Sequence, residues 1–138
     1  MNSVDKFMLR RYSYSLVAKM MSRQTKLPPV STFILICQGR RSGKWIEIPI
    51  FYYRDGENYA LVGSKGGAPE HPLWFLNLQA NPDCKFRVDE KTYDARARVA
   101  VGEERERIWA HATKLFPPYI EYQTRCERQL PVVVLEKK

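Results

Sequence analysis

The sequence predicts an α+β domain built around a small, mostly antiparallel β-barrel. Strand-like segments follow one another with only short turns between them, and such turns connect antiparallel rather than parallel neighbours. The helix-like segments do not alternate regularly with the strands, as they do in a parallel α/β sheet. Neither G-x-G-x-x-G nor G-x-x-x-x-G-K-[ST] occurs in the 138 residues, so a nucleotide-binding Rossmann or P-loop fold is not expected.

The N-terminal segment has a helical rather than a strand-like pattern. Apolar side chains recur every four residues between positions 3 and 23, at Val4, Met8, Tyr12, Leu16 and Met20, and basic residues flank them. This predicts an amphipathic helix, followed by a linker over residues 24–29. We therefore expect a helix and linker over residues 1–30 and the barrel domain over residues 31–138.

Six strands are predicted, at 31–38, 45–54, 59–63, 84–88, 92–101 and 130–135. Arg40-Arg41-Ser42-Gly43 joins the first two, and Asp55-Gly56 is a strong hairpin turn before the third. The last strand, within PVVVLE, is apolar at successive positions rather than alternating positions. We therefore expect it to be a central strand, buried on both faces.

Three helices are predicted among these strands. A short one covers residues 72–80, and a second covers 103–116, where Ile108, Trp109, Ala112, Leu115 and Phe116 share one face. A third begins after Pro117-Pro118 and continues to about residue 128, because proline is favoured in the first turn of a helix.

The positive charge is concentrated near the N-terminus. Residues 1–44 contain nine of the 23 basic side chains and one of the 15 acidic ones, so they account for the whole formal net charge of +8. This predicts an anionic partner: a phosphate, an acidic cofactor, a membrane surface or, at this point, a nucleic acid.

No stretch approaches a membrane span and no signal peptide is recognisable. We expect a cytoplasmic protein. Two possibilities stay open for the N-terminal helix: it docks on the barrel, or it lies on an anionic membrane surface or covers the mouth of a site on the barrel.

Side chains suited to catalysis are few. The cysteines at 37, 84 and 126 form no C-x-x-C pair, and only His71 and His111 are available to join them, so neither a zinc site nor a disulfide framework is indicated. Each histidine is better explained as a capping or solvated side chain than as a general base. If the protein is an enzyme, a bound cofactor is expected to carry the reaction.

The stretch GSKGGAPEHPLWFLNLQANP, residues 63–82, places glycines and a lysine just before a predicted helix. Backbone N–H groups and a lysine at a helix start form a good receptor for a phosphate. Glycine-rich turns are also common as plain connections between a strand and a helix. The residues alone leave both interpretations open.

A series of motifs in a fixed order resembles the deazaflavin-dependent nitroreductase family. The resemblance covers about residues 31–136, and the order of the motifs is more specific than any one of them. They are Gly39-Arg40-Arg41-Ser42-Gly43, Pro49, Asp55-Gly56, Ser64-Lys65-Gly66-Gly67-Ala68, His71-Pro72-Leu73-Trp74-Phe75-Leu76-Asn77-Leu78, Ala80-Asn81-Pro82, Ala95-Arg96-Ala97, Glu104-Arg105, Pro118-Tyr119, Tyr122-Gln123 and Pro131-Val132-Val133-Val134-Leu135-Glu136.

This resemblance implies a split β-barrel of the flavin-reductase type and an oxidoreductase. The enzyme would pass a hydride from a reduced 8-hydroxy-5-deazaflavin coenzyme, of the F420 type, to a small-molecule quinone, nitroaromatic or enone acceptor. Two alternatives remain open: an FMN-binding reductase on the same barrel, and a non-enzymatic carrier of a flavin or lipid. Binding to nucleic acid is not expected, because no basic strand is interleaved with aromatic residues. The chain would be a monomer or a homodimer.

The resemblance also assigns roles to residues. Arg40, Arg41 and Lys65 would surround the phosphate and acidic tail of the coenzyme, and Ser64 would lie beside its ring. Trp74 and Asn77 would share one helix face, with Leu73 and Leu78 packing toward the barrel. The full set of predicted coenzyme-binding residues is Arg40, Arg41, Ser42, Gly63, Ser64, Lys65, Gly66, Gly67, Leu73, Trp74 and Asn77.

The predicted catalytic residues are Tyr119, Tyr122 and Ser64. The two tyrosines would form an apolar wall whose hydroxyls orient the acceptor or donate a proton to it. Two positions depart from the family pattern. Ile46 stands where an arginine is common, with Lys44 nearby to supply charge, and Phe51 stands where some members have a tyrosine.

Overall fold

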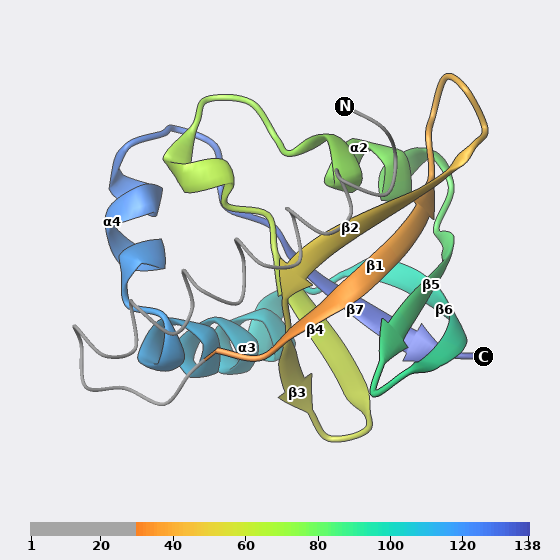
Figure 1. The fold of residues 1–138 in the computed structure, drawn as a ribbon. Helices are drawn as coiled ribbons and strands as arrows, with labels where there is room; N and C mark the ends of the chain where they lie inside the picture. The colour runs from red at the N-terminus through yellow and green to blue at the C-terminus, as the bar shows by residue number, and fades with distance from the viewer. Residues whose placement is uncertain (1–29) are drawn as a thin grey trace.

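The computed structural model describes residues 30–138 and has one antiparallel sheet at its centre (Figure 1). Along the sheet, the strand order is β2-β1-β5-β6-β7-β4-β3. The strands are β1 (Thr32–Gln38), β2 (Trp45–Phe51), β3 (Tyr53–Asp55), β4 (Asn58–Val62), β5 (Asp83–Val88), β6 (Lys91–Val99) and β7 (Val132–Lys137). The helices are the 3₁₀ turn η1 (Lys65–Gly67), α2 (Leu73–Ala80), α3 (Gly102–Leu115) and α4 (Pro118–Thr124). The predicted helix over 3–23 and its linker lie outside the described residues.

The sheet curls into a split barrel. Strands β2 and β4 contact each other although β2 is one edge of the sheet and β4 lies next to the other edge. In Figure 1, α2 lies above the sheet, and α3 and α4 lie to the left of it. The predicted α+β split β-barrel with helical insertions is confirmed for the described residues.

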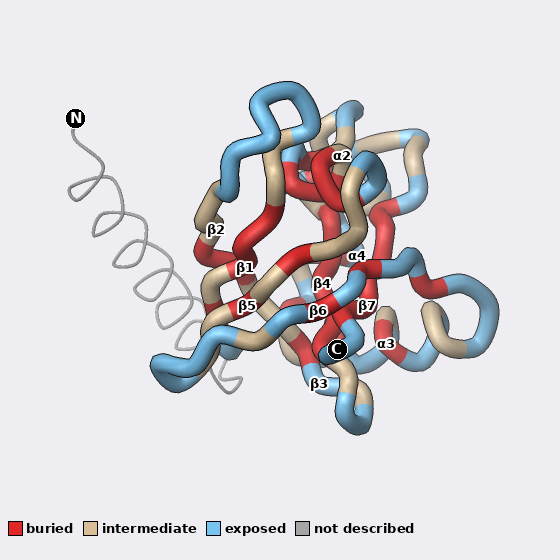
Figure 2. The backbone as a smooth tube through the Cα atoms, turned by 90° about the vertical axis from the view of Figure 1, so that its right-hand side faces the viewer, coloured by how far each residue is buried: buried red, intermediate tan, exposed pale blue. Residues whose placement is uncertain are grey.

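Two hydrophobic clusters occupy the two faces of the sheet. The first contains Phe33, Leu35, Phe86 and Leu135 from the sheet, with Phe75 from α2. The second lies between the sheet and the helices α3 and α4, and it includes Val132, Val134, Ile108, Phe116 and Tyr119. Figure 2 shows the buried parts of the strands at the centre and the exposed hairpins around them.

Strand β7 contributes to both clusters. Val133 and Leu135 belong to the first cluster, whereas Val132 and Val134 belong to the second. Successive side chains of a strand point to opposite faces, so a strand covered on both sides must be apolar at every position. The prediction of a central, doubly buried last strand is therefore confirmed, although the strand begins two residues later than expected.

The single strand predicted over residues 45–54 is wrong in one respect, because it divides at Tyr52. Strand β2 pairs with β1, while β3 pairs with β4, so the chain changes its partner at this corner. The Tyr52 N–H donates to the carbonyl of Ser31 across the break, at 3.0 Å. The predicted Asp55-Gly56 hairpin is confirmed, with Asp55 opposite Asn58 and Gly56 at a φ of 61°.

Helix α4 is shorter than predicted and ends at Thr124. The Gln123 side chain donates to the Arg128 carbonyl at 2.7 Å and accepts from the Leu130 N–H at 2.8 Å. These two bonds hold residues 125–130 as a loop. Within residues 30–138, no helix has the length and apolar character needed to cross a membrane.

Candidate functional site

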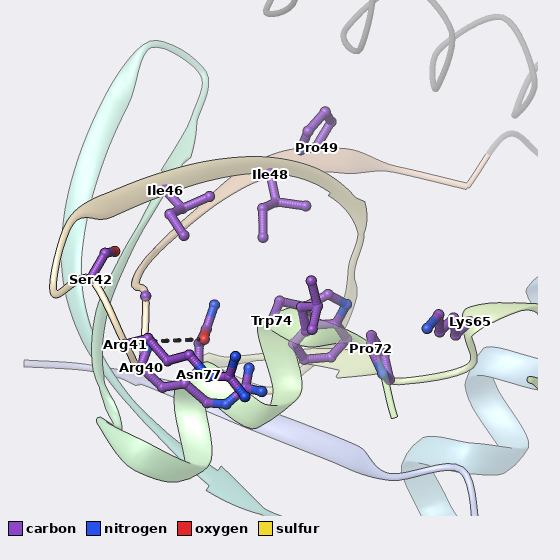
Figure 3. Close-up of a pocket in the computed structure, with 12 residues that line it drawn as sticks. Arg40, Arg41, Ser42, Ile46, Ile48, Pro49, Lys65, Pro72, Trp74 and Asn77 are labelled. Carbon is purple, nitrogen blue, oxygen red and sulfur yellow. Dashed lines mark hydrogen bonds between the residues drawn. The ribbon is translucent and has the colours of Figure 1, made fainter. Parts of the chain in front are cut away.

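A cavity of about 550 Å³ lies between β2, the β1–β2 turn and the start of α2 (Figure 3). It is lined by Gly39, Arg40, Arg41, Ser42, Ile46, Ile48, Pro49, Lys65, Pro72, Leu73, Trp74 and Asn77. The cavity therefore brings together seven of the predicted coenzyme-binding residues, from three separate parts of the chain. These seven are Arg40, Arg41, Ser42, Lys65, Leu73, Trp74 and Asn77.

One wall of the cavity is apolar. Ile46 and Ile48 stand two residues apart on β2 and therefore share its inner face, and Figure 3 shows both pointing toward the cavity. Trp74 from α2 lies across the cavity from them, with only 8% of its surface exposed. The ring of Trp74 meets that of Phe75 edge to face, at 6.3 Å between centroids and 90° between planes. An apolar wall of this kind can hold a flat, largely apolar ring, because ligand sites are lined mainly by hydrophobic and aromatic side chains.

The basic β1–β2 turn is attached to α2 by Asn77. The Asn77 Oδ1 accepts a hydrogen bond from the backbone N–H of Arg40 at 3.0 Å, and Asn77 is only 5% exposed. The turn is also tight, because a Cβ on Gly39 would lie 2.7 Å from Ser42 Oγ. Neither Arg40 nor Arg41 forms a side-chain ion pair with another residue of the described range. Two guanidinium charges are thus held at the cavity without a carboxylate partner there.

Lys65 lies toward the other end of the cavity, beyond Pro72 in Figure 3. Its Nζ forms an ion pair with Glu70 Oε1 at 3.0 Å, and the lysine side chain is 42% exposed. The hydrogen bond from Lys65 lowers the pKa of the Glu70 carboxyl below its ordinary value. Because the pair is solvent-exposed, it holds the lysine only weakly and can be exchanged for a more highly charged anion.

The glycine-rich turn itself packs mainly against protein. A Cβ on Gly63 would lie 2.7 Å from Pro131 Cγ, and a Cβ on Gly67 would lie 2.6 Å from the Tyr122 carbonyl oxygen. A Cβ on Gly66 would meet no neighbouring atom, but the φ of 63° at this residue lies in the left-handed region, which favours glycine. Gly63, Ser64, Gly66 and Gly67 are not among the residues that line the cavity. Their predicted contact with the coenzyme remains a prediction.

The two predicted acceptor-side tyrosines lie outside the cavity lining. Tyr119 is 3% exposed, and its hydroxyl accepts a hydrogen bond from the Tyr53 hydroxyl at 2.8 Å. Burial raises the pKa of both phenols. Tyr122 is half-buried, and the guanidinium of Arg125 lies 5.4 Å from its ring centroid. The catalytic roles of Tyr119, Tyr122 and Ser64 remain predictions.

Leu73 differs from the sequence expectation. It was expected to pack toward the barrel with Leu78, but it is 65% exposed, whereas Leu78 is 4% exposed in the first core cluster. Leu73 is the first residue of α2, so its side chain lies at the rim of the cavity while Leu78 faces the sheet.

Gly39, Ile48, Pro49 and Pro72 also line the cavity, although none of them was among the predicted coenzyme-binding residues. For Ile48 a usable pattern existed, because it stands two positions from Ile46 on the same strand. Arg128 was likewise not predicted. The guanidinium of Arg128 donates to the carbonyls of Gly63, Ser64 and Ala68 at 3.0, 2.8 and 2.9 Å.

A curled, split antiparallel barrel with a basic turn facing an apolar wall defines a flavin-reductase-like fold with a site suited to an anionic ring cofactor. The family model described as F420H(2)-dependent quinone reductase matches residues 10–137. The chain belongs to this family. Membership confirms the predicted family resemblance, the class of enzyme and the deazaflavin coenzyme.

Relatives and solved structures agree with this assignment. An F420H(2)-dependent quinone reductase of Mycobacterium tuberculosis (strain ATCC 25618 / H37Rv) is 33% identical over 114 residues, which cover 80% of this chain and 75% of that protein. The solved structure of an F420-H2 dependent reductase (FDR-A) is 40% identical, covers 76% of this chain and 93% of its own, and has a TM-score of 0.70. A solved domain-swapped dimer is 32% identical, covers 96% and 99% of the two chains, and also has a TM-score of 0.70.

Proposed function

We propose that this chain binds reduced coenzyme F420 in the cavity between β2 and α2 and reduces a quinone. One observation carries the proposal. Two arginines without a carboxylate partner in the described range, Arg40 and Arg41, lie beside an apolar wall made by Ile46, Ile48 and Trp74. This combination suits a ligand that carries a flat apolar ring together with strongly anionic groups.

The residues present fit such a coenzyme. Arg40, Arg41 and Lys65 supply the phosphate and the acidic tail with charge-assisted hydrogen bonds, each worth about 1.5–3 kcal/mol when partly desolvated. Positive charge lies toward both ends of the cavity, and the coenzyme carries more than one negative group. The apolar wall offers the deazaflavin ring a surface from which water is excluded.

When bound, the reduced coenzyme supplies the hydride. The residues of this chain bind and orient it. Asn77 fixes the backbone of the arginine turn, and Trp74 with Ile48 keeps water from the ring face. Such positioning removes much of the entropic barrier of a transfer between two bound molecules. Binding and orienting the coenzyme in this way does not need a buried acid or base.

The rim of the cavity favours an apolar acceptor. Leu73 is 65% exposed there and presents an apolar side chain to a molecule that enters the cavity. A quinone ring would contact Leu73 and enter beside Trp74. Nitroaromatic and enone acceptors have similar flat apolar shapes, so we include them as substrates to be compared with the quinone.

The solved relative that is a domain-swapped dimer supports a homodimer for this chain, because the match covers 96% of it. We propose a homodimer over a monomer on that basis. Light scattering coupled to gel filtration measures the molar mass in solution. A mass of twice 16.2 kDa supports the dimer, and a mass of 16.2 kDa contradicts it.

The test of the function is a turnover assay with the full-length chain. Reduced coenzyme F420 and a soluble quinone are mixed under anaerobic conditions, and the return of the oxidised coenzyme absorbance is followed with and without protein. Reduced FMN replaces the coenzyme in a parallel reaction. The proposal is supported if the protein accelerates the oxidation of reduced F420 by the quinone and does not accelerate that of reduced FMN. It is contradicted if only reduced FMN is oxidised, or if F420 binds but is not oxidised by a quinone, nitroaromatic or enone acceptor.

A further inference from the structure

Arg128 is the residue that organises the glycine-rich turn from outside the turn. It lies in the loop between α4 and β7, about 60 residues further along the chain. Its Nε donates to the Ala68 carbonyl at 2.9 Å, while Nη1 and Nη2 donate to the carbonyls of Gly63 and Ser64 at 3.0 and 2.8 Å. A single planar guanidinium thus holds three carbonyls of one short segment.

A fourth contact completes this arrangement. The Nη1 of Arg128 lies 3.2 Å from Nδ1 of His71. Arginine can only donate hydrogen bonds, so Nδ1 of His71 must carry a lone pair and the imidazole proton must reside on Nε2. Burial and the charge of Arg128 keep the pKa of His71 below its ordinary value, which agrees with a neutral ring.

The turn that Arg128 holds has an unusual backbone. Lys65, Gly66 and Gly67 have φ values of 44°, 63° and 82°, so three successive residues are in the left-handed region. Glycine adopts this region freely, but a lysine does not, and such a conformation persists only where the surroundings determine it. Inside the turn, the Gly67 N–H donates to Ser64 and the Ala68 N–H donates to Lys65, at 2.9 and 3.1 Å.

We propose that Arg128 is a positioning residue for the coenzyme site. By binding the carbonyls of residues 63, 64 and 68, it fixes the turn in the form that places Lys65 at the cavity. This inference rests on the proposed function, since it assumes that Lys65 contacts the anionic part of coenzyme F420. The guanidinium of Arg128 binds backbone carbonyls, and Arg128 is not among the residues that line the cavity.

Arg125 provides a matched control. It also lies near the turn, but it reaches only the Gly66 carbonyl, at 3.4 Å, and it forms an ion pair with Glu121 at 2.7 Å. Arg125→Met therefore removes the same charge from the same neighbourhood while leaving the Arg128 contacts in place. Arg128→Lys is the complementary variant, because it keeps the positive charge but loses the planar fork that reaches three carbonyls.

The experiment has two readouts on the full-length chain. Hydrogen exchange of the peptide covering residues 63–69 is measured without ligand, and the dissociation constant for oxidised coenzyme F420 is measured by calorimetry. For Arg128→Lys we expect faster exchange in that peptide, unchanged protection in β7, and binding weakened by about tenfold. For Arg125→Met we expect both readouts to stay within about twofold of the wild type.

Three results would overturn the inference. Wild-type affinity in Arg128→Lys would show either that charge alone suffices or that the turn does not position the ligand. Faster exchange that extends to β7 would show a general loss of stability. An equal loss of affinity in Arg125→Met would reveal an electrostatic effect without positioning. If the wild-type chain itself does not bind F420, the proposed function fails first, and this inference fails with it.

Discussion

The Oδ1 atom of Asn77 accepts a hydrogen bond from the backbone N–H of Arg40 at 3.0 Å. These residues are 37 positions apart, and their contact joins helix α2 to the turn between β1 and β2. The same amide lies 4.0 Å from the Cys37 sulfur through Nδ2, so both ends of the side chain face protein. This hydrogen bond attaches the arginine turn to the helix that carries the buried Trp74, and both elements line one cavity.

Replacing Asn77 with alanine tests this connection. The Arg40 N–H would lose its acceptor, so the free energy of unfolding should fall by about 1–2 kcal/mol. Because the arginine turn would then be less ordered, coenzyme F420 should bind about tenfold more weakly. Gln79→Ala, at an exposed position of the same helix, is the control, and both quantities should remain near the wild-type values. Unchanged coenzyme affinity in Asn77→Ala would show that the contact serves stability alone.

Lys65→Ala tests the charge of the glycine-rich turn. One charge-assisted contact would be lost, so coenzyme binding should weaken by about 1–3 kcal/mol. Stability without ligand should change by no more than about 0.5 kcal/mol, because the Lys65–Glu70 ion pair is exposed. Calorimetry at low and moderate salt measures the first effect and thermal unfolding the second. Lys91→Ala, on β6, is the control for net charge, and an equal loss there would contradict a local role for Lys65.

Ile46→Arg introduces the residue that the family resemblance leads us to expect at this position. Ile46 lines the cavity, and its Cδ1 lies 3.2 Å from the position of a Cβ on Gly39, so its side chain lies beside the basic turn. An arginine there should reach the anionic part of the coenzyme and tighten binding by about tenfold. Ile46→Met keeps the site neutral and should leave affinity nearly unchanged. Weaker binding in Ile46→Arg would show that this part of the wall faces the ring instead.

The neutral state of His71 predicts a pH dependence. The ring is packed against Phe75, with 4.7 Å between centroids, and faces Arg128, while Lys65 and Glu70 form an ion pair nearby. Because the pKa of His71 is lowered in the folded protein, the unfolded chain binds its proton first as the pH falls. The stabilisation by the neutral ring is therefore complete above a pH of about 6.5 and declines below it.

Urea unfolding of the wild type and of His71→Gln at a series of pH values measures this effect. Glutamine retains an oxygen that can accept from Arg128 but does not titrate. The wild type should lose more stability than the variant as the pH falls below about 6.5. Parallel pH profiles of the two proteins would mean that His71 does not contribute.

Tyr119→Phe distinguishes a structural role from a catalytic one. The Tyr53 hydroxyl donates to the Tyr119 hydroxyl inside the second cluster, so the variant leaves a buried donor without its acceptor. We expect the free energy of unfolding to fall by about 1–2 kcal/mol and the double variant with Tyr53→Phe to recover part of that loss. Turnover per folded molecule should stay within about twofold. A large loss of quinone turnover with unchanged stability would instead support the role predicted from the sequence.

The features that the sequence predicted well are those that local patterns determine. The apolar run at β7, the Asp55-Gly56 hairpin and the proline that begins α4 each have a short-range physical cause. The family motifs identified the basic turn and the residues of α2, and the structure brings these into one cavity. The break at Tyr52 was not predicted, because it arises where the chain changes from pairing with β1 to pairing with β4.

The contacts that the sequence did not predict are long-range ones between side chains and backbone. Nothing near Arg128 in the sequence indicates that it binds carbonyls about 60 residues earlier. The same is true of Tyr119, whose hydroxyl pairs with Tyr53, 66 positions away. A tyrosine pair at i, i+3 fits both a substrate wall and a core, and only the packing of α4 on the sheet decides its burial.

The most direct test of the coenzyme site compares two ligands on the wild-type chain. Calorimetry gives the dissociation constant for oxidised coenzyme F420 and for the same deazaflavin chromophore without its phosphate and acidic tail. If Arg40, Arg41 and Lys65 hold the tail while the apolar wall holds the ring, both should bind, with F420 tighter by at least about a hundredfold at low salt. The advantage of F420 should shrink as salt is added, because the contacts lie in a solvent-accessible cavity. Equal affinity for the two ligands would contradict this assignment of the basic residues.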